Sequence, residues 1–146
     1  MKLVVQRVTS ASVEVDNEVV GKIEDGLMVL VGFGQTDSTR EADYLARKLA
    51  KLRIFEDENG RMNKSVMDIG GKLLLVPQFT LYAHTKKNRP SFHKALAPEE
   101  ATVLFDYFTD KCREFVDVET GEFGAFMKVQ LLNNGPVTIL LEKEFE

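Results

Sequence analysis

Two short segments carry the residues best suited to chemistry on a carbonyl group. The first is Gln78-Phe79-Thr80, which follows an apolar run, and the second is Asn134-Gly135-Pro136, which separates two apolar runs. The sequence contains no G-x-S-x-G, Walker, G-x-G-x-x-G or H-E-x-x-H motif. An enzyme built on this chain would depend on backbone groups, substrate positioning and one hydroxyl, which suffice to hydrolyse an already activated ester.

Both segments also have a purely structural interpretation. Asn134-Gly135 is typical of a hairpin turn, and Pro136 is compatible with the start of a strand at a position that needs no backbone donor. Gln78 and Thr80 fit the outward-facing positions of a strand whose Phe79 points inward. The residues alone leave this choice open.

Neither redox nor metal chemistry is indicated. Cys112 is the only cysteine, so an internal disulfide is excluded, and it lies on the apolar stripe of an expected helix. The two histidines have no neighbouring cysteines or carboxylate clusters. Residues 56–60 end in Asn59-Gly60, which is typical of a solvated turn rather than a metal loop. We expect no metal ion and no cofactor.

One strongly basic segment interrupts an acidic chain. The net charge is −4 at pH 7, yet residues 84–94 read HTKKNRPSFHK and contain no acidic residue. Clustered cations such as Lys86, Lys87 and Arg89 are suited to the phosphates of a polyanion. A solvated loop is the alternative for each cation taken singly.

The elements that must position these residues follow from the spacing of apolar side chains. Apolar or alternating runs bounded by turn residues predict strands over residues 3–8, 13–15, 19–23, 27–31, 72–76, 127–131 and 137–141. One helix is predicted from Ser38, whose spacing from Glu41 is that of a capping box. A second is predicted from Pro98, the favoured first helical position.

The whole pattern predicts one domain, residues 1–146, of the α+β class. No repeat or linker divides the chain, and its 44% of hydrophobic residues provides a core. We expect a β-rich, antiparallel or mixed sheet, curved into a barrel with two main helices; so few helices disfavour a parallel βαβ fold. No apolar run approaches the roughly 20 residues of a membrane span, and no signal-peptide layout is present. We expect a cytoplasmic protein.

The two segments resemble the paired signature of the D-aminoacyl-tRNA deacylases, also called D-tyrosyl-tRNA deacylases. The matching sequences are PQFTLY at residues 77–82 and NGPVT at residues 134–138. Further matches occur in order at Gln6-Arg7-Val8, Lys86-Lys87-Asn88-Arg89-Pro90-Ser91-Phe92, Phe123-Gly124-Ala125 and Met127. The resemblance covers essentially the whole chain. A hairpin turn at residues 134–136 does not by itself predict these further matches elsewhere in the chain, so the resemblance favours the catalytic interpretation.

The resemblance implies a hydrolase that cleaves D-aminoacyl-tRNA, and glycyl-tRNA, to free amino acid and tRNA. It places the amino acid and the 3′-terminal adenosine against Gln78, Phe79 and Thr80. We expect the Phe79 N–H to stabilise the oxyanion, while water attacks with help from the terminal ribose hydroxyl and Thr80 supports it. An alcohol without a nearby base is a poor nucleophile.

The resemblance also implies a homodimer. In such a dimer the Gly135-Pro136 bond is cis, and its carbonyls enter the partner's pocket and exclude L-amino acids. Spacing alone favours Arg7 as a surface charge, whereas the matching arginine of the family supports the Gly-Pro segment. Lys86, Lys87 and Arg89 are then expected to contact tRNA phosphates. We expect no DNA or membrane partner.

Position 77 departs from the family pattern. Pro77 stands where the family usually has serine, and proline there resembles a related animal deacylase group that edits an L-amino acid and carries a trans Gly-Pro bond. Phe79, Val137, Thr138 and Arg7 fit the D-specific type. The remaining alternatives are a deacylase of relaxed chirality, a non-catalytic RNA-binding module and a purely structural β-rich dimer.

Overall fold

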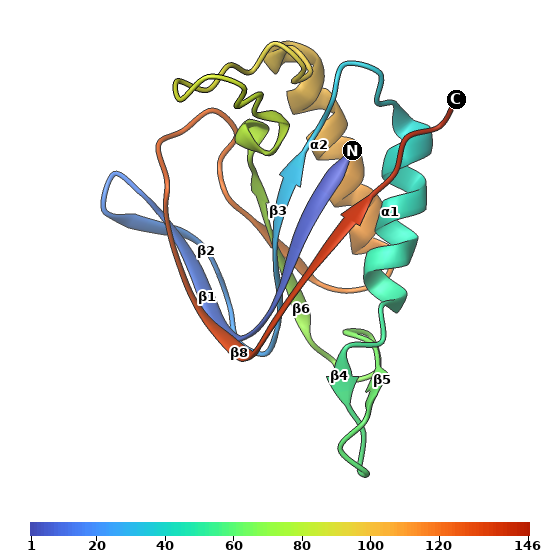
Figure 1. Cartoon of the computed structure of the whole chain (residues 1–146). Coiled ribbons are helices and arrows are strands. Elements are labelled where there is room, and N and C mark those ends of the chain that lie inside the picture. Colours follow the sequence, from blue (N-terminus) through green and yellow to red (C-terminus); the bar gives the residue numbers. More distant parts are fainter.

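A strongly curved mixed sheet and two helices enclose the core in the computed structural model, which describes residues 1–146 (Figure 1). The sheet contains β1 (Lys2–Val15), β2 (Glu18–Ile23), β3 (Gly26–Gly32), β6 (Lys72–Pro77), β7 (Val118–Thr120) and β8 (Lys128–Glu142). The other elements are a ribbon of β4 (Phe55–Glu56) and β5 (Met62–Lys64), the helices α1 (Thr39–Lys51) and α2 (Pro98–Arg113), and the 3₁₀ turn η1 (Phe79–Tyr82). The predicted fold class is confirmed. No helix is long and apolar enough to cross a membrane.

The strand β1 is the axis of the sheet. It pairs with β8 along one edge, and with β3 and then β2 along the other. The predicted hairpin between β1 and β2 is confirmed, with Asp16 and Asn17 at φ values of 52° and 67°. Asp and Asn tolerate this left-handed conformation better than most residues, so the turn follows directly from the sequence.

Two strand pairs are parallel. β3 pairs with β6, and β6 pairs with β7, in parallel register. Parallel strands need a crossover of a dozen or more residues, and α1 and α2 lie in these two crossovers. The expectation that parallel connections are disfavoured was therefore wrong at these places, although the mixed sheet was predicted. The short strand β7 was not predicted.

The C-terminal strand β8 corrects the predicted hairpin at residues 133–136. β8 continues antiparallel to β1 from the pair Lys128–Glu14 to the pair Glu142–Lys2. Between the pairs Asn133–Val8 and Thr138–Gln6, residues 134–137 bulge opposite Arg7. Gly135 has a φ of 141°, outside the left-handed helical region that a type I′ turn requires, so the chain does not reverse.

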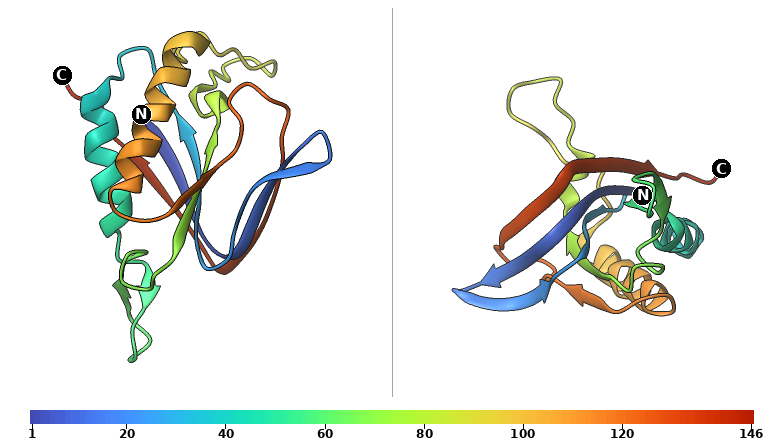
Figure 2. Two further views of the ribbon diagram at one scale, coloured as in Figure 1. Left: turned by 180° about the vertical axis from the view of Figure 1, so that it is seen from behind. Right: turned by 90° about the horizontal axis from the view of Figure 1, so that it is seen from below.

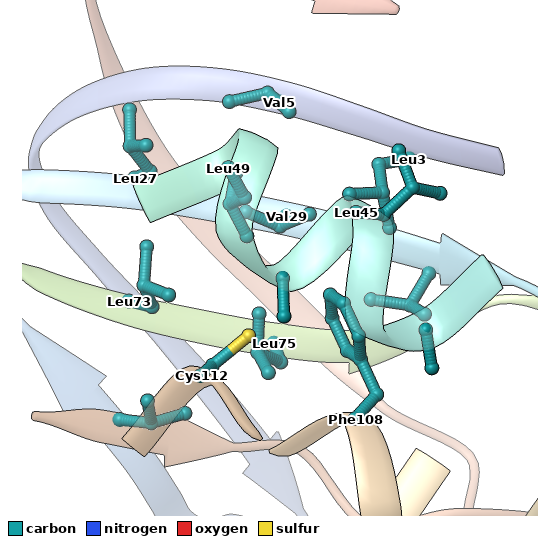
Figure 3. Packing of buried hydrophobic residues seen from close by; sticks show 14 of the residues in the cluster. Leu3, Val5, Leu27, Val29, Leu45, Leu49, Leu73, Leu75, Phe108 and Cys112 are labelled. Carbon is teal, nitrogen blue, oxygen red and sulfur yellow. The ribbon is translucent and has the colours of Figure 1, made fainter. Parts of the chain in front are cut away.

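The main core lies between the helices and one face of the sheet (Figure 3). The apolar stripes of α1 and α2 meet the inward side chains of β1, β3 and β6, and the labelled contacts include Leu49, Phe108, Val29, Leu73 and Leu75. A smaller cluster, which includes Val8, Val13, Ile23, Met28 and Leu74, occupies the other side of the sheet. Together the two clusters fix the ends of β3 and β6, from which the first chemical segment extends.

Candidate functional site

The segment Gln78-Phe79-Thr80 leaves the carboxyl end of β6. The Gln78 N–H donates to the Val31 carbonyl at 2.8 Å, and the chain then turns into η1. Phe79 is 57% exposed, so the interpretation of this segment as a strand with Phe79 buried was wrong. The Gln78 amide donates to the Thr80 hydroxyl, and Thr80 is exposed. The three predicted residues thus lie together at the surface.

Gln78 and Phe79 form part of the wall of an apolar cavity of about 370 Å³, and Thr80 follows them in the chain. Cavities of about 300–1,000 Å³ hold small ligands in proteins. The lining residues come from the ends of β3 and β6, the loop before α2, the start of α2 and the segment after β7: Val31, Phe33, Pro77, Gln78, Phe79, Phe92, Ala95, Leu96, Ala97, Pro98, Ala101, Phe123 and Gly124. Sequence reasoning missed the walls formed by residues 95–98, because small apolar residues in a loop give no signal of a cavity.

The basic loop begins beside this cavity and projects from the body of the molecule (Figure 2). The backbones of His84 and Ser91 exchange two hydrogen bonds, of 2.7 and 3.0 Å, which close the base of the loop. The ring of Phe92 packs edge-on against Phe79, with centroids 5.0 Å apart. Lys86, Lys87 and Arg89 are exposed and form no ion pair. The loop thus adds three free cations near the cavity.

Arg7 is only 6% exposed, so its interpretation as a surface charge was wrong. Its Nε donates to the Asn134 carbonyl at 2.8 Å, and its Nη1 donates to the Ile54 carbonyl at 2.7 Å. The carboxylate of Glu56 lies 3.8 Å from Nη2. Sequence reasoning missed Ile54 and Glu56, because their approach to β1 depends on tertiary packing alone.

The side chain of Asn133 links the two ends of the β8 bulge by hydrogen bonds. Its Oδ1 accepts the Val137 N–H at 2.7 Å, and its Nδ2 donates to the Thr138 hydroxyl at 3.1 Å. The Gly135-Pro136 peptide bond is cis. A Cβ at Gly135 would lie 3.0 Å from the backbone nitrogen of Val137 and 3.2 Å from Nη2 of Arg7, so glycine fits this position best. Gly135 and Pro136 are exposed, and Arg7 and Asn133 hold the segment around them.

The two segments do not come together within one chain. Arg7 is level with Leu27 in β3, whereas Pro77 is level with Val31. The rise from Leu27 to Val31 alone separates them by about 13 Å along the sheet. In Figure 1 the yellow-green turn after β6 lies near the top of the molecule, and β8 bends at the bottom of the sheet, above the β4–β5 ribbon. The two segments therefore lie apart along the sheet of a single chain.

Cys112 takes no part in this site. It is completely buried in the core, and burial raises the pKa of its thiol to about 12. A buried, protonated thiol is inert, so the prediction of a core residue is confirmed. No cluster of three or more His, Cys, Asp or Glu side chains is arranged to hold a metal ion.

The chain is similar to one described protein family and to several named proteins. The family model described as "D-Tyr-tRNA(Tyr) deacylase" matches residues 4–142. The chain is 51% identical to the D-aminoacyl-tRNA deacylase of Thermosipho africanus (strain TCF52B), across 99% of this chain and 98% of the relative. It is 54% identical to the protein of the same name from Bacillus pumilus (strain SAFR-032), across 99% of both chains.

Two solved structures share the fold. One is named "c-Myc DNA Unwinding Element Binding Protein"; it has a TM-score of 0.95 and 43% identity, over 99% of this chain and 100% of that chain. The other is titled "Structural Analysis of a probable eukaryotic D-amino acid tRNA deacylase"; it has a TM-score of 0.83 and 19% identity, over 96% and 97% of the two chains. The second likeness concerns the fold alone.

Proposed function

The chain belongs to the D-Tyr-tRNA(Tyr) deacylase family of hydrolases, and we propose that it removes D-amino acids, and glycine, from the 3′-terminal adenosine of tRNA in the cytoplasm. The observation that carries this proposal is the apolar cavity with Gln78 and Phe79 on its wall, Thr80 next to them in the chain, and three exposed cations in the loop whose Phe92 also lines the cavity. An apolar cavity suits a nucleoside base or an amino-acid side chain, and the cations suit the phosphates of the same substrate.

In this proposal the ester carbonyl lies against the start of η1. Phe79 is the first residue of this turn, where N–H groups have no partner within the helix. Its N–H would meet the negative charge that develops on the carbonyl oxygen as water attacks. The ribose hydroxyl beside the ester assists the water, while Gln78 orients the hydroxyl of Thr80 through their hydrogen bond.

We propose that the Gly135-Pro136 segment acts in the cavity of a second copy of this chain. The separation of the two segments within one chain supports a dimer. So does the free edge of β8, which pairs only with β1 and carries the exposed Leu132 and Leu140. A rigid backbone held by Arg7 would collide with the side chain of an L-amino acid and leave room for a D-residue or glycine.

The experiment that tests this function is deacylation of matched D-tyrosyl-, L-tyrosyl- and glycyl-tRNA by the purified protein. The expected result is release of D-tyrosine and glycine, with L-tyrosyl-tRNA spared. Pro136→Ala is expected to release L-tyrosine as well, because the segment then fits the cavity less closely. Thr80→Ala is expected to retain part of the activity, since its hydroxyl has only a supporting role.

The same assay can also contradict the proposed function. If micromolar enzyme releases no D-tyrosine, the chain is not a D-tyrosyl-tRNA deacylase. Binding of tRNA without turnover would instead support a non-catalytic RNA-binding module, and release of L-tyrosine by the unaltered protein would support a deacylase of relaxed chirality. A triple variant with glutamine at Lys86, Lys87 and Arg89 is expected to bind tRNA more weakly while it keeps its fold.

A further inference from the structure

The two histidines of the chain lie side by side at the base of the basic loop. The ring centroids of His84 and His93 are 5.2 Å apart, in an edge-to-face arrangement. The backbone pairing of His84 with Ser91 brings them together. Gln35 fixes the other side, because its amide donates to the His93 carbonyl and its N–H donates to the Lys94 carbonyl at 3.2 Å. The pair is therefore held by backbone contacts from two parts of the chain.

Ser91 and His93 carry hydrogen-bond donors at exposed positions. The hydroxyl of Ser91 and Nδ1 of His93 form a hydrogen bond of 3.1 Å. If the hydroxyl donates, Nε2 of His93 carries the proton; if Nδ1 donates, the hydroxyl proton of Ser91 is free. In either case one donor remains for a ligand. Neither imidazole contacts a carboxylate, and the charged side chains of this loop are cations.

The position of the pair indicates what it would bind. Phe92 lies between Ser91 and His93 in sequence and contacts Phe79 on the wall of the cavity. The cations Lys86, Lys87 and Arg89 follow His84 further along the loop. Ser91 and His93 flank the cavity residue Phe92 on the loop that carries the cations, so a strand that extends from the cavity to these cations would pass close to them.

We propose that His84, Ser91 and His93 form a binding site for a phosphodiester group of the strand whose 3′-terminal nucleoside occupies the cavity. Imidazole N–H and hydroxyl donors without a competing carboxylate suit a phosphate oxygen, and such contacts position a backbone without reading its sequence. This site rests on the proposed function, since tRNA is the strand concerned. It differs from the three cations, because it acts through directed hydrogen bonds at the base of the loop rather than through the charge of the side chains further along it.

Two matched double variants test the site. His84→Phe with His93→Phe keeps aromatic rings and removes their N–H groups, whereas His84→Gln with His93→Gln keeps an N–H donor and removes the rings. Lys48→Gln, on the exposed face of α1, is the control for an unrelated surface change. Five constants are measured: KM and kcat for D-tyrosyl-tRNA, KM and kcat for D-tyrosyl-adenosine, which has no phosphodiester, and Kd for an uncharged acceptor-stem hairpin.

The phenylalanine variant is expected to raise KM for D-tyrosyl-tRNA and Kd for the hairpin by about tenfold, the worth of one hydrogen bond to a charged group. Its kcat, and its constants for D-tyrosyl-adenosine, are expected to stay unchanged. The glutamine variant is expected to remain within about threefold of the unaltered protein, because it keeps the donors.

Other results would overturn the site. A phenylalanine variant that binds as tightly as the unaltered protein, while the glutamine variant binds weakly, would assign the rings to base stacking instead. Equal losses on D-tyrosyl-adenosine would move their role into the cavity. Histidine-dependent hairpin binding by a protein without deacylase activity would refute the proposed function alone. Full activity with the same hairpin Kd in every variant would refute this site alone, and a protein that neither turns over nor binds the hairpin would refute both.

Discussion

Arg7 joins three parts of the chain that are far apart in sequence. From β1 it reaches the carbonyl of Ile54 before β4 and the carbonyl of Asn134 in the bulge of β8. A guanidinium does this because its donors point in fixed, divergent directions. The sequence offered Arg7 only as a member of a resembling motif, since one charged residue on a strand is usually exposed. The carbonyls that it meets were unpredictable, because every residue has one.

The first prediction concerns the two hydrogen bonds that the guanidinium of Arg7 donates to these carbonyls. Arg7→Lys keeps the charge, but a lysine has one compact ammonium group and cannot span both carbonyls. We expect a loss of about 1–3 kcal/mol in the free energy of unfolding, the cost of a buried polar group left unpaired. We also expect a lower ratio of D- to L-tyrosine release, because the Gly135-Pro136 segment loses its support. Urea unfolding and the two deacylation rates measure these effects.

Arg53→Lys is the matched control. Arg53 makes a similar fork to Asn63, but at an exposed site, so its replacement is expected to change stability by at most about 0.5 kcal/mol. Equal D/L ratios for Arg7→Lys and the unaltered protein would show that Arg7 serves stability alone.

At the scale of elements, local signals were predictable and pairings across the chain were not. The capping box at Ser38 and the Asp16-Asn17 turn involve residues within three or four positions of each other, and both were predicted. The continuity of β8 depends on β1, more than 120 residues away in sequence at Val8 and Asn133. An Asn-Gly pair favours a hairpin turn, but here the segments on both sides of it pair with β1 and not with each other.

The second prediction concerns Glu41, at the start of α1. Its side chain is 2% exposed. Burial opposes its ionisation, but hydrogen bonds from the Phe145 N–H and from the hydroxyl and N–H of Ser38 outweigh that effect, so the pKa is lowered from 4.5. A lowered pKa in the folded state means that the carboxylate stabilises the protein above about pH 4.5, and that this stabilisation is lost as the pH falls through the folded-state pKa.

Glu41→Gln is therefore expected to cost about 0.5–2 kcal/mol at pH 7, as for other helix caps, and less at pH 3. Unfolding in urea at both pH values measures the difference. Glu99→Gln, at an exposed position in the first turn of α2, is the control and is expected to have little effect at either pH. A cost for Glu41→Gln that grew toward low pH would contradict the assignment.

The whole molecule presents its two chemical segments at opposite ends of one sheet. This arrangement follows from the register of β1, β3 and β6, and no local pattern in the sequence specifies it. In the proposed dimer, each site would therefore combine the cavity of one chain with the Gly135-Pro136 segment of the other. The third prediction uses this division.

Two variants are combined in mixed dimers. Arg7→Ala disturbs the segment and leaves the cavity intact, so alone it is expected to release L-tyrosine. Ala97→Trp fills the cavity from an exposed position and leaves the segment intact, so alone it is inactive. Excess Ala97→Trp subunits are expected to lower the release of L-tyrosine several-fold while D-tyrosine release persists, because the remaining cavities receive intact segments. The two chains are co-expressed with different tags, and the rates of D-tyrosine and L-tyrosine release by the mixed dimers are measured. An unchanged ratio of the two rates would show that the segment acts in the site of its own chain.

The bulge in β8 also determines which side chains of the residues after it point toward the core. Before the bulge Val129 and Leu131 pack against the smaller cluster, and after it Ile139 and Leu141 pack against the main core. Because side chains alternate with a period of two, removing one residue from positions 134–137 would turn Thr138 and Leu140 toward the core and expose Ile139 and Leu141. The length of this segment is thus constrained by the folding of the C-terminal strand as well as by whatever Gly135 and Pro136 touch. To keep the same side chains of β8 buried, a variant enzyme would have to lose or gain residues of this segment in pairs.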